Sequence, residues 1–161
     1  MNILHPPFVH FVVALPLIAL FSQFTYVITK DKAYSKAALR IIAFAFLASF
    51  FSVISGVSDA QKILENHTII QDGIDILNNH KIFGFIIMAI LLATSLSKWF
   101  AVSKNSSFLE NLSLILIIIS LAVSLYQGRS GGTLVYKYSA GIDNKVTVSY
   151  THLTLPTICS V

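Results

Sequence analysis

Long, uninterrupted apolar runs alternate with short polar connections along the chain. Four runs reach the length of roughly 20 residues that a helix needs to cross the hydrocarbon core of a bilayer. They cover residues 8–29, 37–56, 81–100 and 108–126. Their apolar residues are continuous and do not alternate with polar ones, as the strands of a membrane barrel would. The pattern predicts an all-α membrane protein, a bundle of four transmembrane helices.

The segment between the second and third runs, residues 57–80, is too polar to cross a bilayer. Its Ile63, Ile70, Ile74 and Leu77 recur near helical spacing, with acidic and amide side chains between them. This pattern predicts an amphipathic segment on the outer face of the bundle. An ordinary solvated loop is the alternative.

Composition agrees with a membrane protein. The chain has 161 residues, is 55% hydrophobic and 11% charged, and has a mean hydropathy of +0.77, whereas a soluble domain carries about 25% charged residues. The net charge of +4 is scattered and forms no basic patch, which argues against a nucleic-acid partner. The lipid bilayer is therefore the expected surrounding.

The last fifteen residues, 147–161, break the pattern of the preceding chain. Residues 148–157 read Val-Ser-Tyr-Thr-His-Leu-Thr-Leu-Pro-Thr and resemble one reading frame of a sequencing-library adapter. We therefore predict a single transmembrane domain over residues 1–146, followed by an artefactual tail. A genuine short polar tail is the alternative. Cys159, the one cysteine, falls in this tail, so the domain itself offers no thiol chemistry.

The distribution of Lys and Arg predicts the orientation in a bacterial inner (cytoplasmic) membrane. Four crossings place both termini on one side and the connections 30–36 and 98–107 on the other. These short connections are dense in lysine, including Lys98, whereas the basic residues of the other side are spread over longer stretches. The positive-inside rule therefore places both termini outside.

Histidine and aspartate gather at the outer ends of the predicted helices. His5 and His10 open the first run, Asp59 follows the second, and His80 opens the third. Histidine at membrane depth usually turns inward to a partner, and neutral imidazole ligates heme iron, zinc and copper. A histidine with a satisfied hydrogen bond at the membrane interface is the plain alternative. Asp59 would either ligate the metal itself or accept a hydrogen bond from the N–H of a ligating histidine.

His10 and His80 come from different helices at similar depth, which is the arrangement of two axial ligands of a heme in a bundle. Their pairing predicts a heme b, since the chain lacks the Cys-x-x-Cys-His motif of covalent attachment. His5 and His10 are five residues apart, about 140° around a regular helix, and are poorly placed to share one ion.

After the fourth run comes a glycine-rich segment that contains Arg129, Gly131 and Gly132. Glycine permits close backbone approach, so this segment is expected to fold back over the outer end or to anchor at the interface. Arg129 would then pair with a heme propionate, a lipid phosphate or Asp59.

Within the runs, Gln23 is expected to form a hydrogen bond between helices. The more specific alternative is that Gln23 belongs to a transport pathway. Residues 81–100 and 108–126 are nearly all Ile, Leu, Ala and Ser, a composition that offers no proton relay or gating charge. An ion pump or voltage sensor is therefore not expected.

Together these motifs resemble those of a bacterial four-span membrane family catalogued as domain of unknown function 2231. They are His-Pro-x-x-x-His at residues 5–10, Gly-x-x-Asp at 56–59, a histidine at 80, and Gly-Gly-x-Leu-Val-Tyr at 131–136. The resemblance covers nearly all of residues 1–146. Ala60 stands where many relatives have tryptophan, and Ile142 stands where they have valine. Relatives are sometimes fused to cytochrome c-like domains, which implies redox work.

Three functions follow as hypotheses. The first is a heme b electron-transfer subunit with His10 and His80 as axial ligands, His5, Asp59 and Arg129 around them, and a periplasmic cytochrome or another redox membrane protein as partner. The second is a site for zinc, copper or iron built from His5, His10, Asp59 and His80. The third is a cofactor-free structural or assembly subunit. No nucleophile elbow, phosphate loop or Cys/His pair is present, so independent catalytic activity is not expected.

Overall fold

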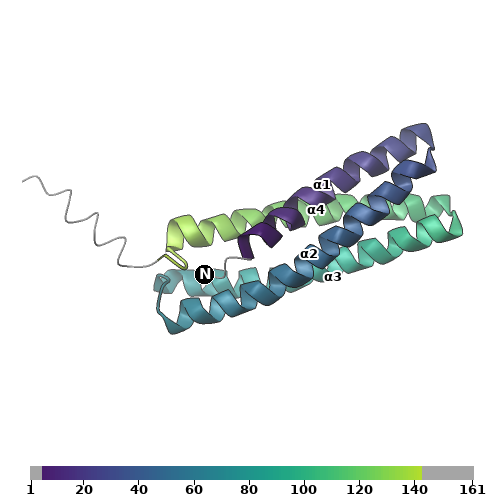
Figure 1. Cartoon of the computed structure of the whole chain (residues 1–161). Helices are drawn as coiled ribbons and strands as arrows, with labels where there is room; N and C mark the ends of the chain where they lie inside the picture. The colour runs from purple at the N-terminus through teal and green to yellow at the C-terminus, as the bar shows by residue number, and fades with distance from the viewer. Residues whose placement is uncertain (1–4, 143–161) are drawn as a thin grey trace, which may run out of the picture.

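The computed structural model describes residues 5–142 and contains four long helices (Figure 1). They are α1 (His5–Thr29), α2 (Lys32–Glu65), α3 (Ile74–Lys104) and α4 (Ser107–Tyr138), with a short 3-10 helix η1 (Gln71–Gly73) before α3. No strand occurs between residues 5 and 142. The all-α prediction and the number of long helices are therefore confirmed.

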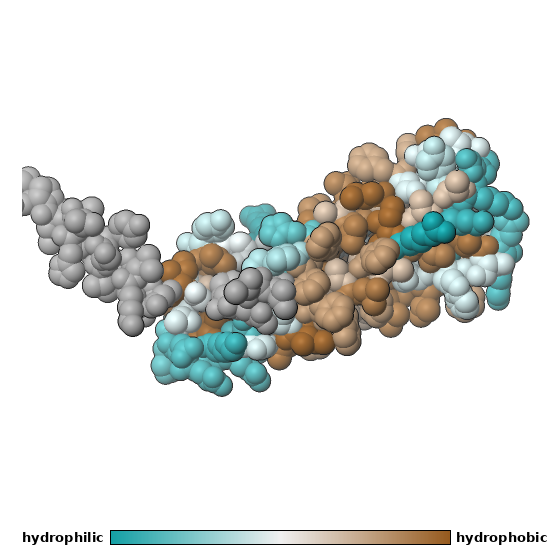
Figure 2. Space-filling view, viewed as in Figure 1, coloured by the Kyte–Doolittle hydropathy of each residue, from teal (hydrophilic) through white to brown (hydrophobic). Residues whose placement is uncertain are grey.

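Each long helix has the length and hydropathy needed to cross a membrane. On the face shown in Figure 2, apolar residues cover the middle of the bundle, and polar residues are concentrated toward its two ends. α2 contains 34 residues, so it extends about 51 Å, whereas a bilayer core is about 30 Å thick. The longer helices therefore project beyond the hydrocarbon region.

At one end of the bundle, both connections are shorter than the sequence predicts. Only residues 30–31 and 105–106 separate the helices there. Asp31 caps α2 by accepting a hydrogen bond from the Ala33 backbone N–H at 2.9 Å, and the Ser106 hydroxyl caps α4 by accepting from Leu109 at 3.5 Å. We call this the short-loop end.

The opposite end, the cavity end, is built mostly of helix (Figure 1). Residues 57–65 continue α2 and residues 74–80 belong to α3, so most of the predicted amphipathic segment consists of extensions of the membrane helices. Ile63 and Leu77 are buried as that pattern indicates, but Ile70 is 52% exposed. The glycine-rich segment was expected to fold back or to anchor at the interface. Its part that contains Gly131 and Gly132 does not fold back, because it continues α4.

What does fold back is the chain after α4. Ser139 adopts a left-handed conformation with φ 55° and ends the helix. The Gly141 backbone N–H then donates to the Thr68 carbonyl at 2.9 Å, and the Ile70 N–H donates to the Tyr138 carbonyl at 3.2 Å. A small apolar cluster lies beneath these bonds: Ala60, Ile63, Leu77, Leu134 and Ala140. The end of α4 is thus tied to the α2–α3 connection.

The helices pack in a closed ring, because α1 contacts α2 and α4, and α3 contacts the same two helices. Small side chains such as Ala19 and Ala45 are fully buried inside the ring, whereas Phe21 and Phe44 are 66% and 64% exposed on its outside. Small residues allow helices to approach closely in lipid, and large apolar residues suit the lipid-facing surface. The apolar exterior is what a bilayer would cover.

We expect Gly73→Ala to destabilise the cavity end by about 1–3 kcal/mol. A Cβ at Gly73 would lie 2.7 Å from Tyr138 Cβ, an atom fixed next to the α4 backbone that cannot swing away. Thermal unfolding in detergent measures the loss. Gly132→Ala is the control because a Cβ there meets nothing within 4 Å. Equal stability of the two variants would contradict this packing.

The tail proposed to be artefactual, residues 147–161 with Cys159, lies outside the described residues. That interpretation stays a prediction.

Candidate histidine cavity

A cavity of about 760 Å³ lies at the cavity end of the bundle. All four long helices line it. Its volume falls within the roughly 300–1,000 Å³ typical of ligand pockets. Of the residues singled out from the sequence, four line this cavity: His5, His10, Asp59 and His80. The prediction that the spans bring these residues to one end is therefore consistent with the structure.

His5 lies at the start of α1 with its ring against α2. Its Nδ1–H donates to the Ser52 carbonyl at 3.1 Å and also lies 3.1 Å from the Ser55 hydroxyl. A carbonyl only accepts, so this bond places the ring proton on Nδ1 and leaves Nε2 as a free lone pair. Gly56 makes room for the ring, since a Cβ there would lie 2.7 Å from His5 Cε1.

His80 is arranged in a similar way on the other pair of helices. It belongs to α3, and its Nδ1 lies 3.2 Å from the Ser130 hydroxyl of α4. Gly131 provides the space, because a Cβ at that position would lie 3.2 Å from His80 Cε1. A hydroxyl donates or accepts, so this contact holds the ring in place without fixing its tautomer. Two histidines are thus each seated against a glycine of the neighbouring helix.

His10 is placed differently. Its side chain is exposed, and its Nδ1–H donates to the Pro6 carbonyl one turn earlier at 2.6 Å. The His5 ring, by contrast, is close enough to interact electrostatically with both the Asp59 carboxylate and the His80 ring. His5 and His10 thus both line the cavity, but the His5 ring lies against α2, whereas the His10 ring bonds within its own helix.

Asp59 is only 3% exposed and lines the cavity from α2. Arg129 does not line it: its side chain is exposed and borders a smaller hollow of about 260 Å³, formed by α3 and α4 together with Tyr126. Lys81 lines the histidine cavity instead. Lys81 follows His80 directly in the sequence, and this adjacency is the signal that could have indicated a basic residue beside the cavity.

No three His, Cys, Asp or Glu side chains converge tightly enough within residues 5–142 to hold a metal ion.

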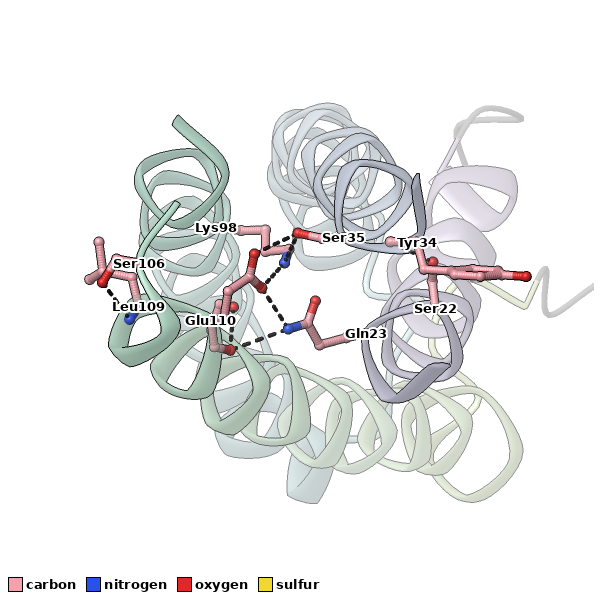
Figure 3. Close-up of polar contacts among 9 residues, drawn as sticks. Ser22, Gln23, Tyr34, Ser35, Lys98, Ser106, Leu109 and Glu110 are labelled. Atoms are coloured by element: carbon pink, nitrogen blue, oxygen red, sulfur yellow. Dashed lines mark hydrogen bonds and ion pairs between the residues drawn. The ribbon is translucent and has the colours of Figure 1, made fainter. Parts of the chain in front are cut away.

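A second polar cluster lies near the short-loop end, and sequence reasoning largely missed it (Figure 3). Lys98 of α3 forms an ion pair with Glu110 of α4, and both are almost completely buried. The Ser35 hydroxyl donates to Glu110 Oε1 at 2.6 Å, and the Gln23 amide donates to Oε2 at 2.8 Å. Lys98 also donates to the Ser35 hydroxyl at 2.8 Å. All four helices thus meet at one buried ion pair.

This cluster corrects two expectations and bears out a third. Lys98 is not a loop residue, because it lies inside α3 with a fully buried side chain, so it no longer counts among the loop charges that set the orientation. Helices α3 and α4 do carry buried ionisable groups. Gln23 does bond between helices. The sequence feature that could have indicated this cluster is Glu110, a single carboxylate just inside an apolar run.

The fold and the site define a class: a small integral membrane protein whose four helices enclose a histidine-lined cavity. The profile of a family of predicted membrane proteins (DUF2231) matches residues 2–144, so the chain belongs to this family. No curated protein and no solved structure matches the chain.

Proposed function

We propose that the histidine cavity binds a heme b and that the chain serves as an electron-transfer subunit of the membrane. One observation carries this proposal. His5 and His80 sit on opposite helix pairs, α1–α2 and α3–α4, and each has Nδ1 engaged by a neighbour, which leaves Nε2 for a ligand. Anchoring one ring nitrogen is how proteins orient an imidazole toward iron or another metal.

The cavity suits a large, mostly apolar group. Its lining is dominated by apolar side chains such as Val12, Ile87 and Leu134, and the macrocycle of a heme would bury itself against them. Lys81 replaces Arg129 as the expected partner of a propionate, because Lys81 lines this cavity. The heme would supply one-electron chemistry, and the protein would orient it and exclude water.

These positions favour His5 with His80 as the ligand pair over His10 with His80. The orientation inferred from the basic residues places the cavity on the outer face, where a periplasmic cytochrome or another redox membrane protein would exchange electrons with it. A transition-metal ion is the second candidate. His5 with Asp59, or His5 with His80, would supply two of its ligands, because the His5 ring interacts electrostatically with each of these groups, and ligands from outside the chain would complete the site.

The test is an absorption spectrum of the detergent-purified full chain, with and without added hemin, before and after reduction. We expect a Soret band that shifts on reduction. His5→Ala and His80→Ala should each lower the affinity for hemin by about tenfold or more, whereas His10→Ala should change it little. His67→Ala is the matched control, since His67 lies in the α2–α3 connection and does not line the cavity.

A spectrum that stays featureless after hemin is added would eliminate the heme, and elemental analysis would then test the metal ion. If His10→Ala abolished the Soret band while His5→Ala kept it, the axial ligands would be His10 and His80, as the sequence analysis expects.

A further inference from the structure

Polar side chains line the interface of α3 and α4 from the cavity to the buried ion pair. On α4 they recur every three to seven residues on the face turned into the bundle, and each is at most 5% exposed: Glu110, Ser113, Ser120 and Ser124. Gln127 follows one turn later and lines the cavity. On α3, Thr94 is fully buried one turn before Lys98.

Polar contacts connect several members of this row, which we call the polar row. Thr94 Oγ1 lies 3.0 Å from Ser120 Oγ. The Gln127 amide donates to the His80 carbonyl at 2.8 Å, which joins the row to the cavity. Lys98 and Glu110 form its other end. Between these contacts, Thr94 and Lys98 on α3, and Ser120 and Ser124 on α4, are each about one helical turn apart, a gap of about 5 Å. Ser113 and Ser120 are two turns apart, so the row passes this stretch through Thr94 on α3.

The polar row reaches across most of a membrane. From Glu110 to Gln127 there are 17 residues of α4, which correspond to about 25 Å, against a hydrocarbon core of about 30 Å. Polar residues that only hold two helices together by hydrogen bonds do not need to form a row of this length.

Packing accounts for part of the row. Ser120 and Thr94 each donate to the carbonyl four residues earlier, at 2.8 and 2.7 Å, a common way to bury a hydroxyl in a helix. It does not account for Ser124 Oγ and Gln127 Oε1, which are buried without a hydrogen-bond partner among residues 5–142. An unsatisfied polar atom in lipid is costly, and bound water is the usual way to satisfy it. Ser124 is 0% exposed and lines the cavity.

We propose that the polar row is a proton path that joins the short-loop end to the histidine cavity. Glu110 takes up a proton from water at the short-loop end. Bound waters and the hydroxyls of Thr94, Ser120 and Ser124 pass it on, each accepting one proton and releasing another. The path ends at Ser124, which lines the cavity, and water in the cavity receives the proton there. Every carrier returns to its starting state, and the proton gradient sets the direction.

The proposal does not need a heme. It assigns a function to the buried ion pair, which the proposed electron-transfer role leaves unused. Ionisable residues inside a membrane commonly mark ion or proton pathways.

The first experiment measures proton flux into lipid vesicles that contain the full chain without added hemin. A potassium gradient with valinomycin drives protons inward, and a pH-sensitive dye inside the vesicles reports them. We expect a flux above that of protein-free vesicles, lowered about tenfold by Thr94→Val, which is a barrier increase of about 1.4 kcal/mol. Thr25→Val is the matched control, because Thr25 forms the same bond to a carbonyl four residues earlier but lies outside the polar row at a partly exposed position.

A second measurement tests water in the row directly and does not depend on flux. In a Cys159→Ser background, Ser120→Cys should react with silver ion, which reaches thiols where water reaches them. Ile118→Cys, exposed on the lipid side, is the control and should stay unreactive in vesicles. Circular dichroism verifies that each variant is folded.

Three results would each overturn the proposal: a flux no greater than in protein-free vesicles, an equal flux in Thr94→Val and the parent chain, or an unreactive Ser120→Cys variant. Loss of hemin binding with the flux intact would count against the electron-transfer role alone.

Discussion

Lys98→Met is expected to lower the free energy of unfolding by about 3–5 kcal/mol, the largest stability effect of any single substitution considered for this bundle. The substitution leaves the Glu110 carboxylate buried without its cation, while Ser35 and Gln23 still donate to it. Two hydrogen bonds do not replace a full charge in a buried site. Because Gln23, Ser35, Lys98 and Glu110 come from four different helices, the whole bundle should loosen at the short-loop end.

The double variant Lys98→Met with Glu110→Gln should recover most of this loss. It removes both charges together, and replacing a buried ion pair by neutral groups is often close to neutral. SDS titration followed by circular dichroism measures both variants. Lys36→Met, at an exposed position near the same end, should change stability by less than about 0.5 kcal/mol. A loss in the double variant as large as in Lys98→Met would show that the pairing is not what stabilises this end.

Gly56→Ala is expected to weaken hemin binding by about 10–100-fold with little change in stability. The new Cβ would lie 2.7 Å from His5 Cε1, so the ring must move. A ring at the end of a side chain moves at low cost, but it then loses its hydrogen bond to the Ser52 carbonyl. Alanine is also the better helix former, by about 1 kcal/mol. The variant should therefore stay folded while His5 no longer presents Nε2 to the cavity.

Two other glycines calibrate this effect. At Gly131 a Cβ would lie 3.2 Å from His80 Cε1, and at Gly132 it would meet nothing within 4 Å. The loss of affinity should accordingly decrease from Gly56→Ala to Gly131→Ala and vanish in Gly132→Ala. Hemin titration of the three purified variants, with melting temperatures measured alongside, gives the order. Equal affinities in Gly56→Ala and Gly132→Ala would contradict the seating of His5 against α2.

Much of the architecture was accessible from the sequence. The length of each apolar run predicts a transmembrane helix, because a bilayer leaves no other way to satisfy the backbone of a single segment. The ends of the helices were less predictable. α2 continues to Glu65 and α4 to Tyr138, since outside the hydrocarbon region a helix no longer needs apolar residues and hydropathy stops reporting it.

The sequence predicted at which end of the bundle the candidate site lies, but it did not predict how the side chains of the site are arranged. His5, Asp59 and His80 line one cavity as expected, because alternate crossings bring their helix ends to the same side. Spacing could not show that the His5 ring lies against α2 while the His10 ring bonds within its own helix, or that Lys81 lines the cavity and Arg129 does not. Each of these features depends on how a helix is rotated about its own axis.

The sequence by itself determined the class of protein, the number of crossings and the end at which the histidines gather, because the cost of exposing backbone to lipid depends only on segment length and composition. The tertiary structure alone decided which side chains face one another. Lipid is as apolar as the interior of the bundle, so hydropathy does not distinguish the inward face of these helices from the outward one. The polar contacts do: Gln23 with Glu110, Lys98 with Glu110, and His5 with Ser52. Each needs a partner from another helix, and only the assembled bundle provides it.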